Sequence, residues 1–106
     1  MTGITLNKYY DRVIFTAEGH SGYKKSGEDI VCAAVSALCF TLLEALRDEQ
    51  SSRHLKLVRE IVSDSYMCIE AEPFSFAEER VQAIIDTVYT GLSMLAEKYP
   101  EYVRID

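Results

Sequence analysis

Basic residues are scarce in this sequence. Its 106 residues contain 11 lysines and arginines against 17 aspartates and glutamates, which gives a formal net charge of -6 at pH 7. A nucleic-acid binder needs a basic face to neutralise phosphates, and Lys24-Lys25 is the only adjacent pair of lysine or arginine residues. We therefore expect no direct binding of nucleic acid. An acidic surface suits a basic protein partner instead, because opposite potentials speed the encounter.

Signals for secretion or membrane insertion are also missing. Residues 1–8 lack the basic segment and apolar run of a signal peptide. The longest apolar stretch, residues 31–43, is bracketed closely by Asp29 and Glu44. We expect this stretch to be too short to span a bilayer. The sequence therefore predicts a cytoplasmic protein with no membrane partner.

Closely spaced cysteine pairs are absent. The three cysteines, Cys32, Cys39 and Cys68, form no Cys-x-x-Cys motif, so neither a zinc site nor a thioredoxin-like site is indicated. We expect no metal and no cofactor. In a reducing cytoplasm all three should be free thiols. Cys39 follows Cys32 by two helical turns, too far for a disulfide, and is interpreted as a core residue, whereas Cys68 is interpreted as structural.

No internal repeat, low-complexity tract or linker divides the chain, which indicates one domain over residues 1–106. Alternating apolar and polar residues predict strands near residues 4–7, 13–17, 55–61 and 67–71, and allow a fifth at 102–105. Helical spacing predicts two helices, one beginning at Asp29 and one ending near Leu95. This order predicts an α+β fold, with a small antiparallel or mixed sheet of four to five strands and two helices packed on one face.

Two details of the helices are also predicted. The first helix is apolar over most of its circumference, so we expect it to be heavily buried, while its acid pair Asp48-Glu49 is interpreted as solvated. Ser75 and Glu78 match the capping-box pattern Ser-x-x-Glu, which places the start of the second helix at Ser75.

Cys32 is the candidate nucleophile. If Asp29 caps the first helix, Cys32 occupies the third helical position, beside unsatisfied N–H groups and the positive end of the helix dipole. That setting favours a reactive thiolate, whereas the nearby carboxylates of Glu28 and Asp29 oppose it.

His20 is the candidate base. It follows the second predicted strand, and a loop with three glycines within residues 19–28 separates it from Cys32. Such a loop can bring its two ends together. An imidazole beside a thiol can accept its proton and later protonate a leaving amine, and N–H groups at the helix start can stabilise an oxyanion. This is the minimum apparatus for thiol proteolysis.

The whole segment from residue 19 to residue 36 resembles the Prp family of bacterial cysteine proteases. The residues that carry the resemblance are Gly19-His20-Ser21-Gly22-Tyr23, Gly27 and Asp29-Ile30-Val31-Cys32-Ala33-Ala34-Val35-Ser36. It implies a small α+β protein, commonly homodimeric, that removes the N-terminal extension of the large-subunit ribosomal protein numbered twenty-seven (bL27). The extension of that substrate is aromatic-rich near its end, which implies an apolar groove in the enzyme.

By this resemblance His20 is the catalytic histidine and Cys32 the nucleophile, while Asp29 and Ser36 match further motif positions. Asp29 either orients the site or caps the helix, the cap being favoured. Ser36 either hydrogen-bonds near the thiol or packs the helix. The family's mobile substrate loop falls on Gly19, Ser21, Gly22, Tyr23 and Gly27. Ser21 stands where a small alanine is common, and no third member of a triad is evident.

Two other functions are compatible with the sequence. A non-catalytic module that docks on a ribosomal protein or an assembly factor would use the acidic surface without an activated thiol. A thiol-based acyl transferase would use the same Cys-His pair, whereas redox exchange is disfavoured because no second cysteine lies near Cys32.

Overall fold

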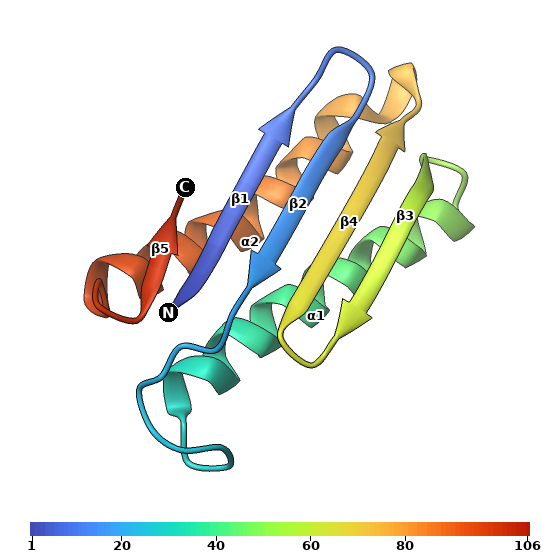
Figure 1. Ribbon diagram of the computed structural model, residues 1–106. Helices are drawn as coiled ribbons and strands as arrows, with labels where there is room; N and C mark the ends of the chain where they lie inside the picture. The colour runs from blue at the N-terminus through green and yellow to red at the C-terminus, as the bar shows by residue number, and fades with distance from the viewer.

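Five strands form one mixed sheet, and two helices cover one of its faces, in the computed structural model of residues 1–106 (Figure 1). The elements are β1 (Thr2–Lys8), β2 (Val13–Glu18), α1 (Ile30–Ser51), β3 (Leu55–Ser63), β4 (Tyr66–Pro73), a 3-10 turn η1 (Ser75–Ala77), α2 (Glu78–Lys98) and β5 (Val103–Ile105). The predicted α+β fold is confirmed, including the short fifth strand.

The strand order is β3-β4-β2-β1-β5. β5 runs parallel to β1, and every other pairing is antiparallel. Because β2 lies beside β4, Glu18 at the end of β2 is paired with Tyr66 at the start of β4. The loop after β2 and the turn between β3 and β4 therefore meet at one end of the sheet, where α1 also begins (Figure 1).

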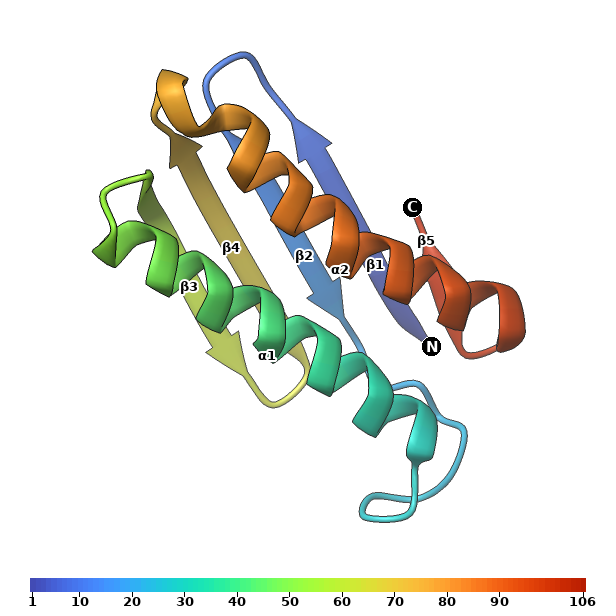
Figure 2. The same ribbon diagram turned by 180° about the vertical axis from the view of Figure 1, so that it is seen from behind.

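The core lies between the sheet and the two helices, which run side by side in opposite directions (Figure 2). Twenty buried apolar residues form a single cluster. In β2 the alternation predicted from the sequence places Val13, Phe15 and Ala17 in this cluster. Leu42 of α1 and Leu92 of α2 are at most 1% exposed. Burying a side chain of this size contributes roughly 1.5–3 kcal/mol to stability.

The prediction that α1 is heavily buried is wrong. Its buried residues are Val31, Val35, Cys39, Leu42, Leu43, Leu46 and Glu49. On the remaining surface, Ile30 is 60% exposed and Phe40 is 47% exposed. The reason is geometric: α1 has the sheet beneath it and α2 on one side, so the rest of its apolar circumference has no neighbour.

α1 has 22 residues and is longer than the uninterrupted apolar stretch suggested. By length and composition alone it could cross a membrane. In the fold it is a core helix whose buried face contacts the sheet and α2, and core helices commonly meet the same criterion.

The predicted capping box at the start of α2 is also wrong. Ser75 lies inside the 3-10 turn η1, which is closed by a hydrogen bond from the Ala77 N–H to the Phe74 carbonyl oxygen at 2.9 Å. α2 begins at Glu78, and its N-cap residue Ala77 has no side chain that could accept a hydrogen bond. The turn occupies the residues that a capping box would need.

Glu49 is buried rather than solvated. It is 4% exposed and accepts hydrogen bonds from Arg80 Nε of α2 and from His54 Nδ1, the latter at 3.2 Å. The hydrogen bond from Arg80 lowers the pKa of Glu49, burial opposes the shift, and His54 adds to it. This carboxylate therefore joins the end of α1 to α2 and to the residue that precedes β3.

A β-bulge in β3 changes which side chains face the helices. Leu57 pairs with Ala71 but Arg59 pairs with Glu70, so Val58 is an extra residue. Beyond the bulge Glu60 and Val62 lie on the helix side, where Glu60 accepts a hydrogen bond from Arg47 Nε at 2.5 Å. Without the bulge, a strict two-residue alternation would have turned Val62 away from α1.

Candidate active site

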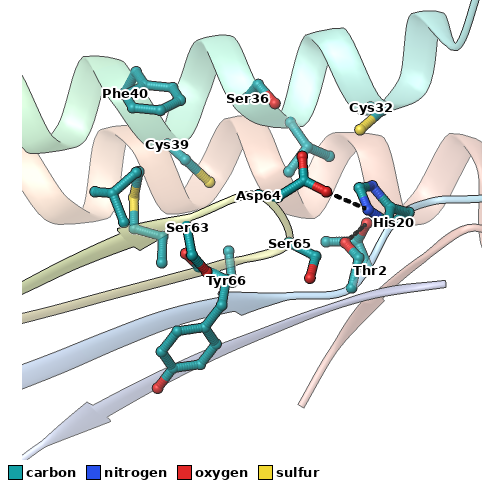
Figure 3. Close-up of a pocket in the computed structure, with 15 residues that line it drawn as sticks. Thr2, His20, Cys32, Ser36, Cys39, Phe40, Ser63, Asp64, Ser65 and Tyr66 are labelled. Atoms are coloured by element: carbon teal, nitrogen blue, oxygen red, sulfur yellow. Dashed lines mark hydrogen bonds and ion pairs between the residues drawn. The ribbon is translucent and has the colours of Figure 1, made fainter. Parts of the chain in front are cut away.

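A cavity of about 80 Å³ lies between the first half of α1 and the turn between β3 and β4 (Figure 3). His20, Cys32, Ser36 and Asp64 line it, and eight of its fifteen lining residues are hydrophobic. The same four residues also line a wider, more polar hollow of about 610 Å³ under the loop of residues 19–29. The candidate nucleophile Cys32 and the candidate base His20 therefore both lie where the cavity and the hollow meet.

Asp29 holds both the helix start and the loop. It is the N-cap of α1, and its Oδ1 accepts a hydrogen bond from the Cys32 N–H at 2.8 Å. Its Oδ2 accepts from Ser21 Oγ at 2.5 Å and from the Tyr23 N–H at 3.1 Å. Ser21 is buried as a result, with 2% of its surface exposed. Asp29 thus fixes the backbone at Cys32 and the path of the loop together.

Two opposing effects set the ionisation of Asp29. Burial raises its pKa, but the hydrogen bonds from Ser21 and from the N–H groups of Cys32, Lys24 and Tyr23 outweigh burial, and the net pKa is lowered. Asp29 is therefore ionised at neutral pH, as a carboxylate surrounded by donors should be.

Gly19 fixes the position of His20 through the backbone. Its N–H donates to the Ser65 carbonyl oxygen at 2.8 Å, and its own carbonyl accepts from Thr2 Oγ1 at 3.0 Å. Its φ is +91°, and a Cβ there would lie 2.5 Å from the Met1 carbonyl oxygen. Only glycine avoids that collision, so residue 19 can be tied to β1 and to the β3–β4 turn at once.

Tyr23 anchors the middle of the loop. Its ring makes edge-to-face contacts with Tyr99, at a centroid distance of 5.7 Å, and with Tyr102, at 5.2 Å. Such pairs contribute about 0.5–1.5 kcal/mol each beyond the buried area. Beyond Tyr23, residues 24–28 are exposed, and Gly22 and Gly27 have positive φ with open space around them.

The three cysteines differ in their surroundings. Cys32 is partly exposed at the cavity, in the third position of α1. Cys39 is buried, and burial raises the pKa of its thiol to about 12. Cys68 is also buried, but it alternates with the core residues Met67 and Ile69 and so lies on the opposite face of the sheet. Cys39 also lines the cavity, but burial keeps its thiol protonated at neutral pH, so Cys32 is the cysteine placed to react with a molecule there.

His20 and Ser36 line the cavity together with Cys32. The His20 side chain is 60% exposed, and its Nε2 lies 3.4 Å from Asp64 Oδ2 (Figure 3). Ser36 is one helical turn beyond Cys32 and is exposed, so it does not pack α1 against the core. It faces the substrate space from the same side of the helix as the thiol.

Asp64 is the site residue that the sequence analysis missed. It lies in the turn Ser63-Asp64-Ser65, which has no special motif. The one available signal was an aspartate in the turn between β3 and β4, which lies beside the end of β2. Recognising that signal requires the pairing of β2 with β4, which a single sequence does not reveal.

The sequence model of a family described as "Cysteine protease Prp" matches residues 1–104. The chain belongs to the Prp cysteine protease family. This match spans almost the whole chain and confirms the resemblance that rested on residues 19–36. Among curated proteins the comparison finds no match.

Solved structures share the fold of this Prp family member. A Staphylococcus aureus ribosomal processing protease Prp with a covalently linked product peptide has a TM-score of 0.78 at 22% identity, covering 100% of this chain and 98% of that one. The same protease with a substrate peptide has a TM-score of 0.72, with equal identity and coverage. SMU.848 from Streptococcus mutans is 31% identical, with a TM-score of 0.69, over 100% of this chain and 92% of that one.

Replacing Gly19 by alanine should destabilise the protein more than replacing Gly27. Both glycines have positive φ, but only Gly19 would place a Cβ against backbone atoms. We expect Gly27→Ala to cost about 1 kcal/mol from conformation alone, and Gly19→Ala about 2–4 kcal/mol. Urea unfolding followed by circular dichroism measures both. Equal losses would contradict the proposed close contact at residue 19.

The contribution of Asp29 should disappear in acid. Because the pKa of Asp29 is lowered in the folded state, its ionised form stabilises the fold at neutral pH, and this stabilisation is lost as the pH falls below 3.8. Asp29→Asn keeps a capping oxygen but cannot titrate. The difference in unfolding free energy between wild type and Asp29→Asn should be largest near pH 7 and shrink below pH 3.8. A difference that stays constant across this range would refute the assignment.

Proposed function

We propose that this chain is a cysteine endopeptidase that removes an N-terminal extension from a large-subunit ribosomal protein, with Cys32 as nucleophile and His20 as general base. One observation carries the proposal: in a member of the Prp cysteine protease family, Cys32 at the tip of α1 and His20 after β2 line the same cavity. The Staphylococcus aureus protein of the same fold is described as an essential ribosomal processing protease bound to a substrate peptide.

The proposed reaction has two stages. His20 takes the Cys32 proton, and the thiolate attacks the scissile carbonyl carbon to give a tetrahedral oxyanion. N–H groups of the first turn of α1 that are not bonded to Asp29 stabilise this charge. The C–N bond then breaks, His20 protonates the leaving amine, and a thioester to Cys32 remains. Water, deprotonated by His20, hydrolyses the thioester and restores the thiol.

The apolar part of the cavity suits the aromatic residues expected near the end of the substrate's extension. Val35 and Phe40 of α1 line it together with Val62 and Met67 of the sheet. Its volume of about 80 Å³ is below the roughly 150 Å³ of an engineered cavity that holds benzene. An aromatic side chain of the substrate must therefore widen it, and a change in the side-chain conformation of Phe40, which is 47% exposed at its wall, would do so. The net charge of -6 favours a basic ribosomal protein as partner.

Cleavage of the candidate precursor tests this proposal. The wild-type protein should release the N-terminal extension of the ribosomal protein bL27 from the same organism, detected by mass spectrometry of both products. Cys32→Ala and His20→Ala should each lower kcat/KM by at least about 10³-fold. Cys68→Ala, which removes a buried thiol on the opposite face of the sheet, is the matched control and should retain cleavage.

Three results would overturn the proposal. Cleavage by Cys32→Ala, with contaminating protease excluded, would remove the nucleophile. Binding of the intact precursor without cleavage would indicate a docking module, and an acylated product in place of two peptides would indicate acyl transfer.

We further propose that the protein acts in the cytoplasm as a homodimer. The support is the apolar surface of α1 that α2 leaves open, which includes Ile30 and Ala37 and borders the cavity at Phe40. Sedimentation equilibrium should give twice the protomer mass of 12.0 kDa. Ala37→Glu places a charge on this surface and should shift the equilibrium toward monomer. A wild-type protein that stays monomeric at concentrations near 100 μM would contradict the dimer.

A further inference from the structure

We infer that Asp64, in the turn between β3 and β4, is the positioning residue that orients His20 toward Cys32. The inference rests on the proposed function, because it assigns a role within the same Cys-His pair. Its first observation is direct: His20 Nε2 lies 3.4 Å from Asp64 Oδ2, and both residues line the two hollows that meet at Cys32 (Figure 3).

The fold brings these two side chains together through backbone contacts. The Gly19 N–H donates to the Ser65 carbonyl oxygen at 2.8 Å. Gly19 precedes His20 and Ser65 follows Asp64, so this bond lies one residue from each. The pairing of Glu18 with Tyr66 continues it into the sheet. The β2–β4 ladder therefore holds the backbones of His20 and Asp64 close together.

The other carboxylates near the site are already engaged. Both oxygens of Asp29 accept hydrogen bonds, one from the Cys32 N–H and the other from Ser21 and Tyr23. Glu28 forms an ion pair with Lys25 at 3.8 Å. Among the acids that line the two hollows, Asp64 is thus the one directed at the imidazole.

This ion pair favours one ring nitrogen for the reaction. Once the imidazole turns so that Nε2–H donates to the Asp64 carboxylate, Nδ1 carries the lone pair and is the atom that can accept the thiol proton. The resulting imidazolium then lies beside a negative charge. In the resting protein the side chains of His20 and Asp64 are 60% and 95% exposed, so water screens the pair. A substrate that covers both groups would exclude this water and strengthen their interaction.

The experiment uses the reactivity of Cys32, which needs no substrate. Six titratable groups line the hollows with His20: Lys24 and Asp29 from the loop, Cys32 and Cys39 from α1, Asp64 from the turn and Tyr66 from β4. Iodoacetamide labelling of Cys32, located by peptide mass spectrometry, is followed from pH 5 to pH 9. We expect Asp64→Ala to slow labelling about tenfold near pH 6 and little at pH 9, where ordinary thiols ionise.

Two further variants separate orientation from charge. Asp64→Asn retains an oxygen that can accept from Nε2–H but has no charge, so its labelling rate should fall between those of wild type and Asp64→Ala. Asp11→Ala removes an exposed carboxylate from the β1–β2 turn at the other end of the sheet and should match wild type. With a cleavable peptide, Asp64→Ala should lower kcat about tenfold with KM nearly unchanged, and its urea midpoint should equal that of wild type.

The outcomes separate this inference from the proposed function. Labelling and cleavage by Asp64→Ala at wild-type rates would overturn the role of Asp64, and so would faster labelling, which would mean that Asp64 restrains His20. If labelling depends on Asp64 as expected but no ribosomal precursor is cleaved, the role of Asp64 stands and the proposed substrate fails.

Discussion

The architecture of the site depends on the carboxylate of Asp29. One oxygen caps α1 through the N–H of Cys32, and the other receives the hydroxyl of Ser21 and the N–H of Tyr23. The same group therefore sets where the thiol lies and how the preceding loop approaches it. This carboxylate has a structural role, because turning either oxygen away would break the hydrogen bonds that hold the helix start or the loop. The two carboxylates therefore have different contacts: Asp29 bonds the helix start and the loop, and Asp64 faces His20.

The sheet supplies the remaining constraint. β2 ends before His20, β4 begins after Asp64, and the two strands are neighbours, although their sequences are separated by the whole of α1 and β3. The bulge at Val58 then turns Val62 toward α1 and completes the apolar wall of the cavity. Each catalytic candidate is thus held by a different element, and those elements meet at one end of the sheet. This arrangement allows a small fold to assemble a site from short-range and long-range contacts together.

The sequence predicted those features that local patterns encode. The strands, both helices and the cap position of Asp29 follow from alternation, helical spacing and residue preferences acting over a few residues. The exposed face of α1 was missed because the hydrophobicity of a residue indicates only that it tends to be buried. It does not indicate whether another element lies beside that face of the helix. The capping-box error at Ser75 arose because a 3-10 turn fits the same residues. The contact between His20 and Asp64 depends on strand order, which lies outside any local window, so sequence reasoning found the histidine without its partner.

The aromatic contacts of Tyr23 connect the loop to a distant part of the chain. Tyr99 and Tyr102, which support it, follow α2 and are translated long after the loop itself. A nascent chain that ends within α2 would already carry the thiol and the imidazole, but the segment above them would lack its aromatic support. The order of the loop over the site therefore depends on residues near the end of the chain.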